Sequence, residues 1–111
     1  MREGNGMGEG EFHTVARLDE IPATGLKGVA VEEQKIVLVR QGDQVFALED
    51  RCSHEEFALS DGEIVAGQIE CALHGARFDP ATGAPKALPA VKPVKTFECR
   101  VEGDVVQVRI D

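Results

Sequence analysis

The feature that most constrains this chain is a pair of short segments with metal-ligating side chains, Cys52-Ser53-His54 and Cys71-Ala72-Leu73-His74. Each segment supplies one thiolate and one imidazole, and both groups bind transition metals. Residues 55–70 separate the two segments. The two segments therefore supply four candidate metal ligands, Cys52, His54, Cys71 and His74.

Short alternating runs of Val, Ile and Phe, punctuated by turn residues, predict β-strands before the first segment. These runs are residues 12–18, 28–32, 35–40 and 45–48. We expect turns at Glu33-Gln34 and at Gly42-Asp43, and the second turn is a typical hairpin signal.

After the second segment, the runs 96–102 and 105–110 flank Gly103-Asp104 and predict another hairpin. No segment has a convincing 3.6-residue apolar period, and residues 18–22 allow one helical turn at most. Between the two groups of strands, residues 51–89 are rich in Gly and Pro. The sequence therefore predicts an all-β fold that carries an inserted, loop-rich unit.

The domain organisation expected for the 111 residues is simple. A Gly-rich stretch at residues 1–10 predicts a flexible tail, and residues 11–111 predict a single domain. Hydrophobic residues make up 42% of the chain, enough for a folded core. A domain of this size is also small enough that a metal site would help to stabilise it.

The two ligand segments with their surroundings, residues 51–83, resemble the Rieske signature. The resemblance implies an antiparallel Rieske-like β-sandwich with an inserted cluster-binding subdomain at about residues 51–89. It also implies one [2Fe–2S] cluster per chain, with His54 and His74 in place of two cysteines on one iron. Cys52 and Cys71 complete the implied ligand set, and no catalytic residue is expected.

This mixed ligand set determines the charge of the implied cluster. Two thiolates and two neutral imidazoles leave the oxidised centre neutral, whereas four thiolates would leave it negative. An electron enters a neutral centre more easily in a medium of low dielectric constant, so the histidines raise the reduction potential. In the family the His-bearing iron is the outer one, which implies that electrons enter and leave at His54 and His74.

Zinc is the alternative metal, since it also binds two Cys and two His. Zinc fingers space these ligands as C-x₂₋₄-C followed by H-x₃₋₅-H. Here Cys and His alternate, and one spacer is a single residue. The spacing favours the cluster over zinc and over a chance arrangement of unliganded side chains.

Residues around the ligands are expected to tune the cluster. Gly75 and Gly62 are small enough to let backbone N–H groups approach the cluster sulfurs. Residues 77–83 resemble the return strand and tight turn of the family, and residues 88–93, with Pro89, resemble the loop that lies over the cluster.

Departures from the Rieske proteins of respiratory complexes indicate a lower potential. Those proteins have a disulfide beside the cluster, whereas Glu56 or a neighbour and Leu73 occupy its positions here. They also place hydroxyl donors near the cluster, whereas this chain has Ala76 and no Tyr. Negative charge at Glu55 and Glu56, beside His54, also disfavours the reduced centre. The pattern resembles the soluble Rieske ferredoxins of bacterial ring-hydroxylating dioxygenases.

The charge and cysteine content bear on partners and location. Twelve Lys and Arg against twenty Asp and Glu give a net charge of −8. This disfavours nucleic acid and anionic membranes and favours a basic protein partner. No apolar run reaches the roughly 18 residues of a membrane span, and residues 1–10 lack the apolar region of a secretory signal. Three cysteines fit a reducing cytoplasm better than a disulfide framework.

Three further predictions concern single residues. Glu55 and Glu56 are expected to contribute to partner docking, because they adjoin a ligand. Cys99 is expected to be a small buried hydrophobe on the same strand face as Phe97. His13 is expected to be a solvated surface residue.

The function predicted from these observations is that of a monomeric one-electron carrier between a flavin reductase and a terminal oxygenase. The chain is not expected to be an oxygenase itself, because a mononuclear iron site needs two His and a carboxylate. Once His54 and His74 bind the cluster, only His13 remains. Two alternatives stay open: a small Rieske-like subunit of a nitrite reductase, and a regulatory or assembly-associated Rieske protein.

Overall fold

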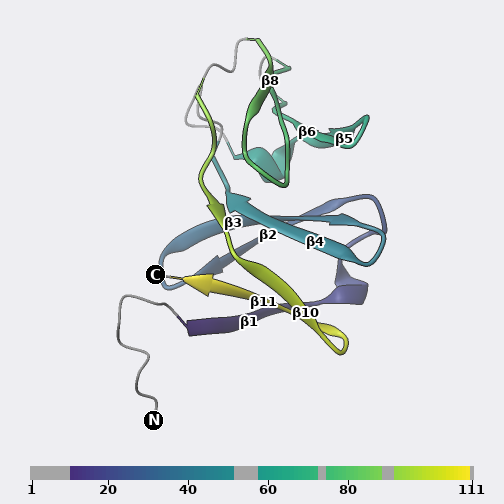
Figure 1. The fold of residues 1–111 in the computed structure, drawn as a ribbon, viewed down its shortest axis with the longest axis vertical. Coiled ribbons are helices and arrows are strands. Elements are labelled where there is room, and N and C mark those ends of the chain that lie inside the picture. The colour runs from purple at the N-terminus through teal and green to yellow at the C-terminus, as the bar shows by residue number, and fades with distance from the viewer. Residues whose placement is uncertain (1–10, 52–57, 73–74, 89–91, 111) are drawn as a thin grey trace.

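The computed structural model describes residues 11–51, 58–72, 75–88 and 92–110, and these form three antiparallel sheets (Figure 1). The strands are β1 Glu11–Arg17, β2 Leu26–Val31, β3 Gln34–Gln41, β4 Gln44–Glu49, β5 Glu63–Val65, β6 Gln68–Glu70, β7 Arg77–Phe78, β8 Pro85–Ala87, β9 Thr96–Phe97, β10 Cys99–Glu102 and β11 Val105–Ile110. Two 3₁₀ turns are η2 Leu18–Glu20 and η3 Leu59–Asp61.

The all-β prediction is confirmed, and the tail expected at residues 1–10 lies outside the described residues. Within the described ranges, no helix is long and apolar enough to cross a membrane.

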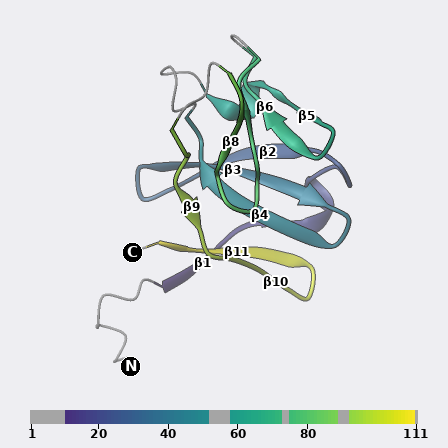
Figure 2. The same ribbon diagram turned by 45° about the horizontal axis from the view of Figure 1, so that its top comes forward.

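The three sheets are stacked with one of them in the middle (Figures 1 and 2). The outer sheet has the strand order β1-β11-β10, the central sheet β2-β3-β4-β9, and the insert sheet β5-β6-β7-β8. All four strands of the insert sheet lie between β4 and β9 in the sequence. The insert sheet therefore interrupts the central sheet in sequence and covers one face of it in space.

Strand β3 is buried on both faces, which explains its unbroken apolar run Ile36-Val37-Leu38-Val39. Side chains alternate between the faces of a strand. Between the central and insert sheets lies the upper core, formed by Val37, Val39, Leu48, Leu59, Ile69, Cys71, Ala76, Phe78 and Val94. Between the central and outer sheets lies the lower core, formed by Ala16, Ile21, Val31, Ile36, Leu38, Val45, Ala47, Val106 and Val108.

The strand expected at residues 96–102 is two strands in two different sheets. Thr96 and Phe97 pair with β4 in the central sheet, whereas β10 pairs with β11 in the outer sheet. Glu98, between them, accepts a hydrogen bond from the N–H of Arg109 at 2.9 Å. The prediction of one strand was wrong because apolar alternation continues through a corner at which a strand changes sheets.

Turn positions were predicted correctly where glycine marks them. The turn at Gly42-Asp43 is confirmed, and Gly42 has a φ of 66°. The turn expected at Glu33-Gln34 lies one residue earlier, at Glu32-Glu33, with φ values of 51° and 73°. A two-residue hairpin turn with positive φ at both positions normally takes Asn or Gly, so the two glutamates gave no turn signal.

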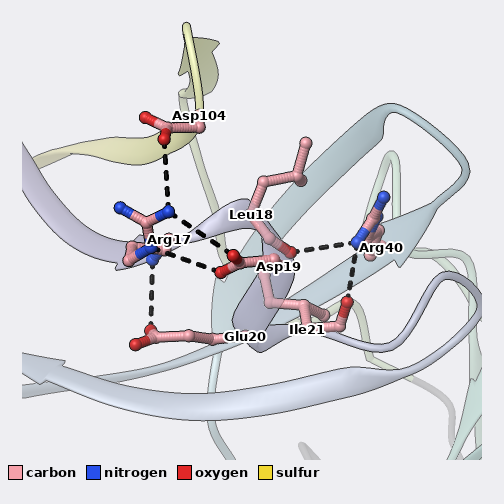
Figure 3. Close-up of polar contacts among 7 residues, drawn as sticks. All are labelled: Arg17, Leu18, Asp19, Glu20, Ile21, Arg40 and Asp104. Carbon is pink, nitrogen blue, oxygen red and sulfur yellow. Dashed lines mark hydrogen bonds and ion pairs between the residues drawn. The ribbon is translucent and has the colours of Figure 1, made fainter.

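Two arginines fix the corner between the outer and central sheets (Figure 3). From β3, Arg40 donates hydrogen bonds through Nη1 to the carbonyl oxygens of Leu18 at 3.0 Å and Ile21 at 2.9 Å. At the end of β1, Arg17 lies 3.3 Å from the carboxylate of Asp104 in the β10–β11 turn. These contacts hold the chain where it passes from the outer sheet into the central sheet.

Candidate metal centre

The insert sheet brings several expected cluster-bearing segments to one of its ends. Strand pairing aligns Glu63, Glu70, Arg77 and Ala87 in one row across the four strands. One step further along the strands, at the ligand end of the insert sheet, are Gly62, Cys71, Ala76 and Leu88. Residues 58–62, which follow the first ligand segment, therefore meet the second ligand segment and the start of the 88–93 loop at this end.

Cys71 stands at the base of the β6–β7 hairpin. Its N–H donates to the carbonyl oxygen of Ala76 at 2.7 Å, and its own carbonyl accepts the N–H of Gly75 at 3.1 Å. Gly75 has a φ of 76°, in the left-handed region that favours glycine. These two bonds link the backbone of Cys71 to that of Gly75 and Ala76, on the far side of the expected ligand His74 in the sequence.

The side chain of Cys71 faces the upper core and is only 1% exposed. Phe78, Leu59 and Val94, which belong to the same core, are also buried. A cysteine held at a strand end in an apolar environment is shielded from water on its inner side. This placement suits a ligand on the inner side of a cluster.

The remaining predicted ligands lie outside the described residues, as do several of their predicted neighbours. These positions are Cys52, His54, His74, Leu73, Pro89, Glu55 and Glu56. In the part of the chain that is described, no three His, Cys, Asp or Glu side chains form a metal-binding group. The assignment of Cys52, His54 and His74 as ligands therefore remains a prediction.

Among the predicted tuning residues, Gly75, Ala76 and Gly62 are described. The N–H of Gly75 is donated to Cys71, and the N–H of Gly62 is donated to the carbonyl of Leu59 at 2.9 Å. Ala76 is fully buried beside Cys71 in the upper core. The two glycine N–H groups thus stabilise backbone turns at the ligand end, and their influence on a cluster remains a prediction.

Two glycines allow close backbone approaches in this region. A Cβ atom at Gly62 would collide with the carbonyl oxygen of Glu70, and one at Gly83 would collide with that of Val94. The N–H of Val94 also donates to the carbonyl oxygen of Gly83 at 2.9 Å. The first contact holds the residues that follow the first ligand segment against β6. The second holds the segment before β9 against the β7–β8 turn.

An ion pair that the sequence analysis missed flanks the β6–β7 hairpin. The Nε atom of Arg77 donates to Oε2 of Glu70 at 3.0 Å, and both side chains are partly buried. The two residues are direct cross-strand partners. The sequence carries no signal for this pair, because residues 51–89 were expected to be loop-rich and only the strand pairing places the two opposite charges face to face.

The other candidate donors, Cys99 and His13, lie on strands of the outer sheet, away from the ligand end. Cys99 is partly buried, whereas a buried position was expected, and it packs against the lower core with Phe97 and Val101. The expected strand face shared with Phe97 was wrong, because Phe97 belongs to β9 and Cys99 to β10. Burial raises the pKa of its thiol from 9.0 to about 11. His13 is half-buried on β1, whereas a solvated position was expected.

The described residues fit the cluster that the motif implies. Two thiolates and two imidazoles are the ligand set of a Rieske centre. Cys71 follows the end of β6, faces the upper core and is bonded through its backbone to Gly75 and Ala76. Such a cluster supplies a one-electron couple.

Comparison with known proteins identifies the family. Residues 11–98 match the family model described as the Rieske [2Fe-2S] domain. The chain therefore belongs to the Rieske [2Fe–2S] family, which confirms the resemblance and the cofactor inferred from its sequence.

Several similar proteins are ferredoxin components. The ferredoxin subunit of anthranilate 1,2-dioxygenase from Burkholderia cepacia is 34% identical over 100 residues, covering 90% of this chain and 93% of the relative. The solved ferredoxin of carbazole 1,9a-dioxygenase from Nocardioides aromaticivorans has a TM-score of 0.86 and 38% identity, covering 90% of this chain and 98% of its own. A chain in a complex of reduced oxygenase and oxidised ferredoxin of carbazole 1,9a-dioxygenase has a TM-score of 0.82 and 31% identity, covering 88% and 92%.

Proposed function

We propose that this chain is the ferredoxin component of a ring-hydroxylating dioxygenase system. It carries one electron at a time from a flavin-dependent reductase to a terminal oxygenase, and it catalyses no reaction itself. The observation that carries the proposal is the near-complete overlap with ferredoxin components, which reaches 98% of one solved relative. The proposal places the protein in the cytoplasm as a monomer.

The proposed ligands are Cys52, His54, Cys71 and His74. The role of the chain is to hold these side chains and to keep water from the inner side of the centre. Packing of Cys71 among apolar side chains of the upper core supports that role. Leu73, Gly75, Ala76 and Pro89 are the proposed neighbours that set the polarity around the cluster.

Partner docking is proposed at the ligand end of the insert sheet. Leu88, at this end, is 78% exposed and is the one large exposed hydrophobic side chain among the described residues. Asp61 and Glu63, from the same end, are also exposed. Asp61 and Glu63 give this end negative charge, and Leu88 gives it an apolar contact point. Glu55 and Glu56 are proposed to add to that negative charge. A small interface steered by charge allows a carrier to bind and leave quickly.

Composition of the purified protein tests the cofactor directly. The chain has no Trp and no Tyr, so the protein without cofactor absorbs little near 280 nm. We expect a red-brown protein with two iron and two sulfide per chain, as a [2Fe–2S] centre requires. Stoichiometric zinc in a colourless native sample would overturn the proposal.

Reconstitution tests the carrier role. We expect turnover of a ring-hydroxylating oxygenase, supplied with its reductase, to depend on this chain. Stoichiometric co-purification with a nitrite reductase, and failure to support the oxygenase, would instead favour the fixed-subunit alternative.

A charge-reversal experiment tests the docking surface. We expect Glu55→Lys with Glu56→Lys to slow association with the oxygenase at least tenfold at low salt, with the cluster spectrum unchanged. The matched control is Asp43→Lys with Glu102→Lys, which makes the same change in net charge at the β3–β4 turn and at the end of β10. Equal slowing by both double variants, or wild-type transfer that is indifferent to ionic strength, would contradict steering at the ligand end.

A further inference from the structure

Asp50 and Ser60 make two short hydrogen bonds across the base of the first ligand segment. The N–H of Ser60 donates to Oδ1 of Asp50 at 2.7 Å, and the hydroxyl of Ser60 donates to Oδ2 at 2.7 Å. Both bonds are partly buried and use both oxygens of one carboxylate. Hydrogen bonds to an ionised acceptor are stronger than bonds between neutral groups. The pair therefore joins the two ends of residues 51–59, which contain Cys52 and His54.

This pair packs against the central sheet at Gly28 of β2. A Cβ atom at Gly28 would lie 3.0 Å from Oγ of Ser60 and 3.2 Å from Oδ2 of Asp50. These distances are tighter than ordinary van der Waals contact, so a methyl group here would displace the two side chains. The absence of a side chain at Gly28 lets the hydrogen-bonded pair sit directly against the central sheet.

Each member of the pair is also held by its own backbone. The N–H of Asp50 donates to the carbonyl oxygen of Lys35 at the start of β3, at 2.9 Å. Ser60 belongs to the 3₁₀ turn η3, whose first residue, Leu59, is fully buried in the upper core with Cys71. The pair thus connects the central sheet, the ends of the first ligand segment and the core around the second ligand segment.

We infer that Asp50 and Ser60 are positioning residues for the cluster, and that they set the location of the first ligand segment relative to Cys71. The inference rests on the proposed function, because it requires Cys52 and His54 to be ligands. Neither side chain is proposed to touch the metal. They act by closing the base of residues 51–59 on Gly28, so that the segment keeps one geometry when the cluster is bound.

The test measures the cluster itself in the full-length holoprotein. Ser60→Ala removes one hydrogen bond without changing charge. Gly28→Ala adds a methyl group on β2 that crowds both side chains of the pair without altering either of them. We expect Ser60→Ala to lose its cluster to an excess of iron chelator about fivefold faster than wild type, roughly the factor that corresponds to one hydrogen bond. For Gly28→Ala we expect a smaller acceleration in the same direction. Both variants should show broader EPR lines in the reduced state, because a less constrained ligand segment allows a wider range of cluster geometries.

Two further variants separate geometry from charge. An asparagine in Asp50→Asn accepts the N–H of Ser60 and donates to its hydroxyl, so we expect a rate of cluster loss within twofold of wild type. Its reduction potential should rise, because a negative charge near the electron is removed. Asp50→Ala loses both the charge and the bonds, and it should lose its cluster faster than Asp50→Asn.

The control is Thr14→Val on the outer sheet, which removes the hydrogen bond that Gln107 donates to Thr14 at 3.1 Å. We expect Thr14→Val to lower thermal stability with no change in the rate of cluster loss. If Ser60→Ala and Gly28→Ala behave like this control, with wild-type EPR lines, the positioning role is wrong. A wild-type protein without any [2Fe–2S] centre would instead refute the proposed function, so the two failures are distinguishable.

Discussion

The scaffold, formed by the outer and central sheets, and the insert sheet are built in different ways. In the scaffold, β3 is paired along six residues with β2 on one side and with β4 on the other. In the insert sheet, β7 has two residues, and β5, β6 and β8 have three each. Short ladders of this kind are marginally stable in isolation. The scaffold is therefore stabilised by continuous pairing and burial, whereas the insert depends on a few discrete links.

Those links have a common location. The Glu70–Arg77 ion pair and the close approach of Gly62 to Glu70 both lie beside the ligand end. The Asp50–Ser60 pair holds the other side of the same end. Regions with few cooperative contacts open at lower free energy than regions with continuous pairing. We therefore expect the insert to lose its structure before the scaffold when the cluster is removed.

Replacement of Cys71 has the largest effect that this comparison predicts. We expect Cys71→Ala to abolish the visible absorbance and the bound iron, because a proposed ligand is lost. Backbone amides of β3 should stay protected in hydrogen exchange while those of β6 and β7 become exposed. The matched control is Cys99→Ala in the scaffold, which should keep its cluster. Retention of a full iron complement by Cys71→Ala would show that the ligand assignment is wrong.

Truncations on the two faces of β3 separate the two cores. Leu38→Ala opens the lower core, and we expect it to reduce the free energy of unfolding by about 3 kcal/mol. Val39→Ala opens the upper core and should cost about 2 kcal/mol. Urea denaturation measures both costs, and chelator-induced cluster loss should accelerate only for Val39→Ala. Equal acceleration in both variants would mean that the cores are not independent.

Two glycines of the insert test the importance of close backbone contact. Gly83 and Gly67 have φ values of 76° and 77°, so an alanine is strained by a similar amount at either position. A Cβ atom at Gly83 would also collide with the carbonyl oxygen of Val94, whereas none lies within 4 Å at Gly67. We expect Gly67→Ala to cost about 1 kcal/mol and Gly83→Ala roughly 2 kcal/mol more, measured by urea denaturation. Similar costs would show that the segment before β9 adapts freely.

The smallest expected signal is the alkylation of Cys99. Its pKa of about 11, raised by burial, leaves roughly 100-fold less thiolate at pH 8 than a thiol with the ordinary value. We therefore expect almost no reaction with iodoacetamide in the folded holoprotein and rapid reaction in urea. Rapid labelling of folded protein at pH 8 would contradict the burial of this thiol.

The same pKa shift affects the stability of the fold. Because the folded-state pKa of Cys99 lies above the ordinary value of 9.0, the free energy of unfolding should decline as the pH rises from about 9 to 11.

The sequence predicted the scaffold well where its periodicity and turn residues were informative. Gly42 and Gly103 marked hairpin turns, and the apolar run Ile36–Val39 marked a strand, whose burial on both faces became evident only from the structure. It predicted the corner at Glu98 poorly, because alternation does not reveal which sheet a residue pairs with. The turn at Glu32-Glu33 was displaced because the chain uses glutamate in a conformation that usually takes glycine.

For the candidate site, the motif predicted residue identities and little of their support. The C-x-x-H pattern marked Cys71 as a ligand candidate without predicting the turn that it opens. Strands β5, β6 and β8 were read as loop because strands of three residues have no detectable period. The Asp50–Ser60 pair could not be foreseen. Its two residues lie ten positions apart without a pattern, and their proximity depends on where Gly28 of another strand lies.

The double burial of β3 also limits how the cluster-bearing unit can be transplanted. The insert has no complete core of its own, because Val37 and Val39 of the scaffold fill one side of it. A synthetic peptide that spans residues 50–95 would leave that apolar side in water. A graft onto another β-sandwich would need a recipient strand with the same pair of valines. For protein engineering, the smallest portable electron-carrying module is therefore the insert together with the central sheet beneath it.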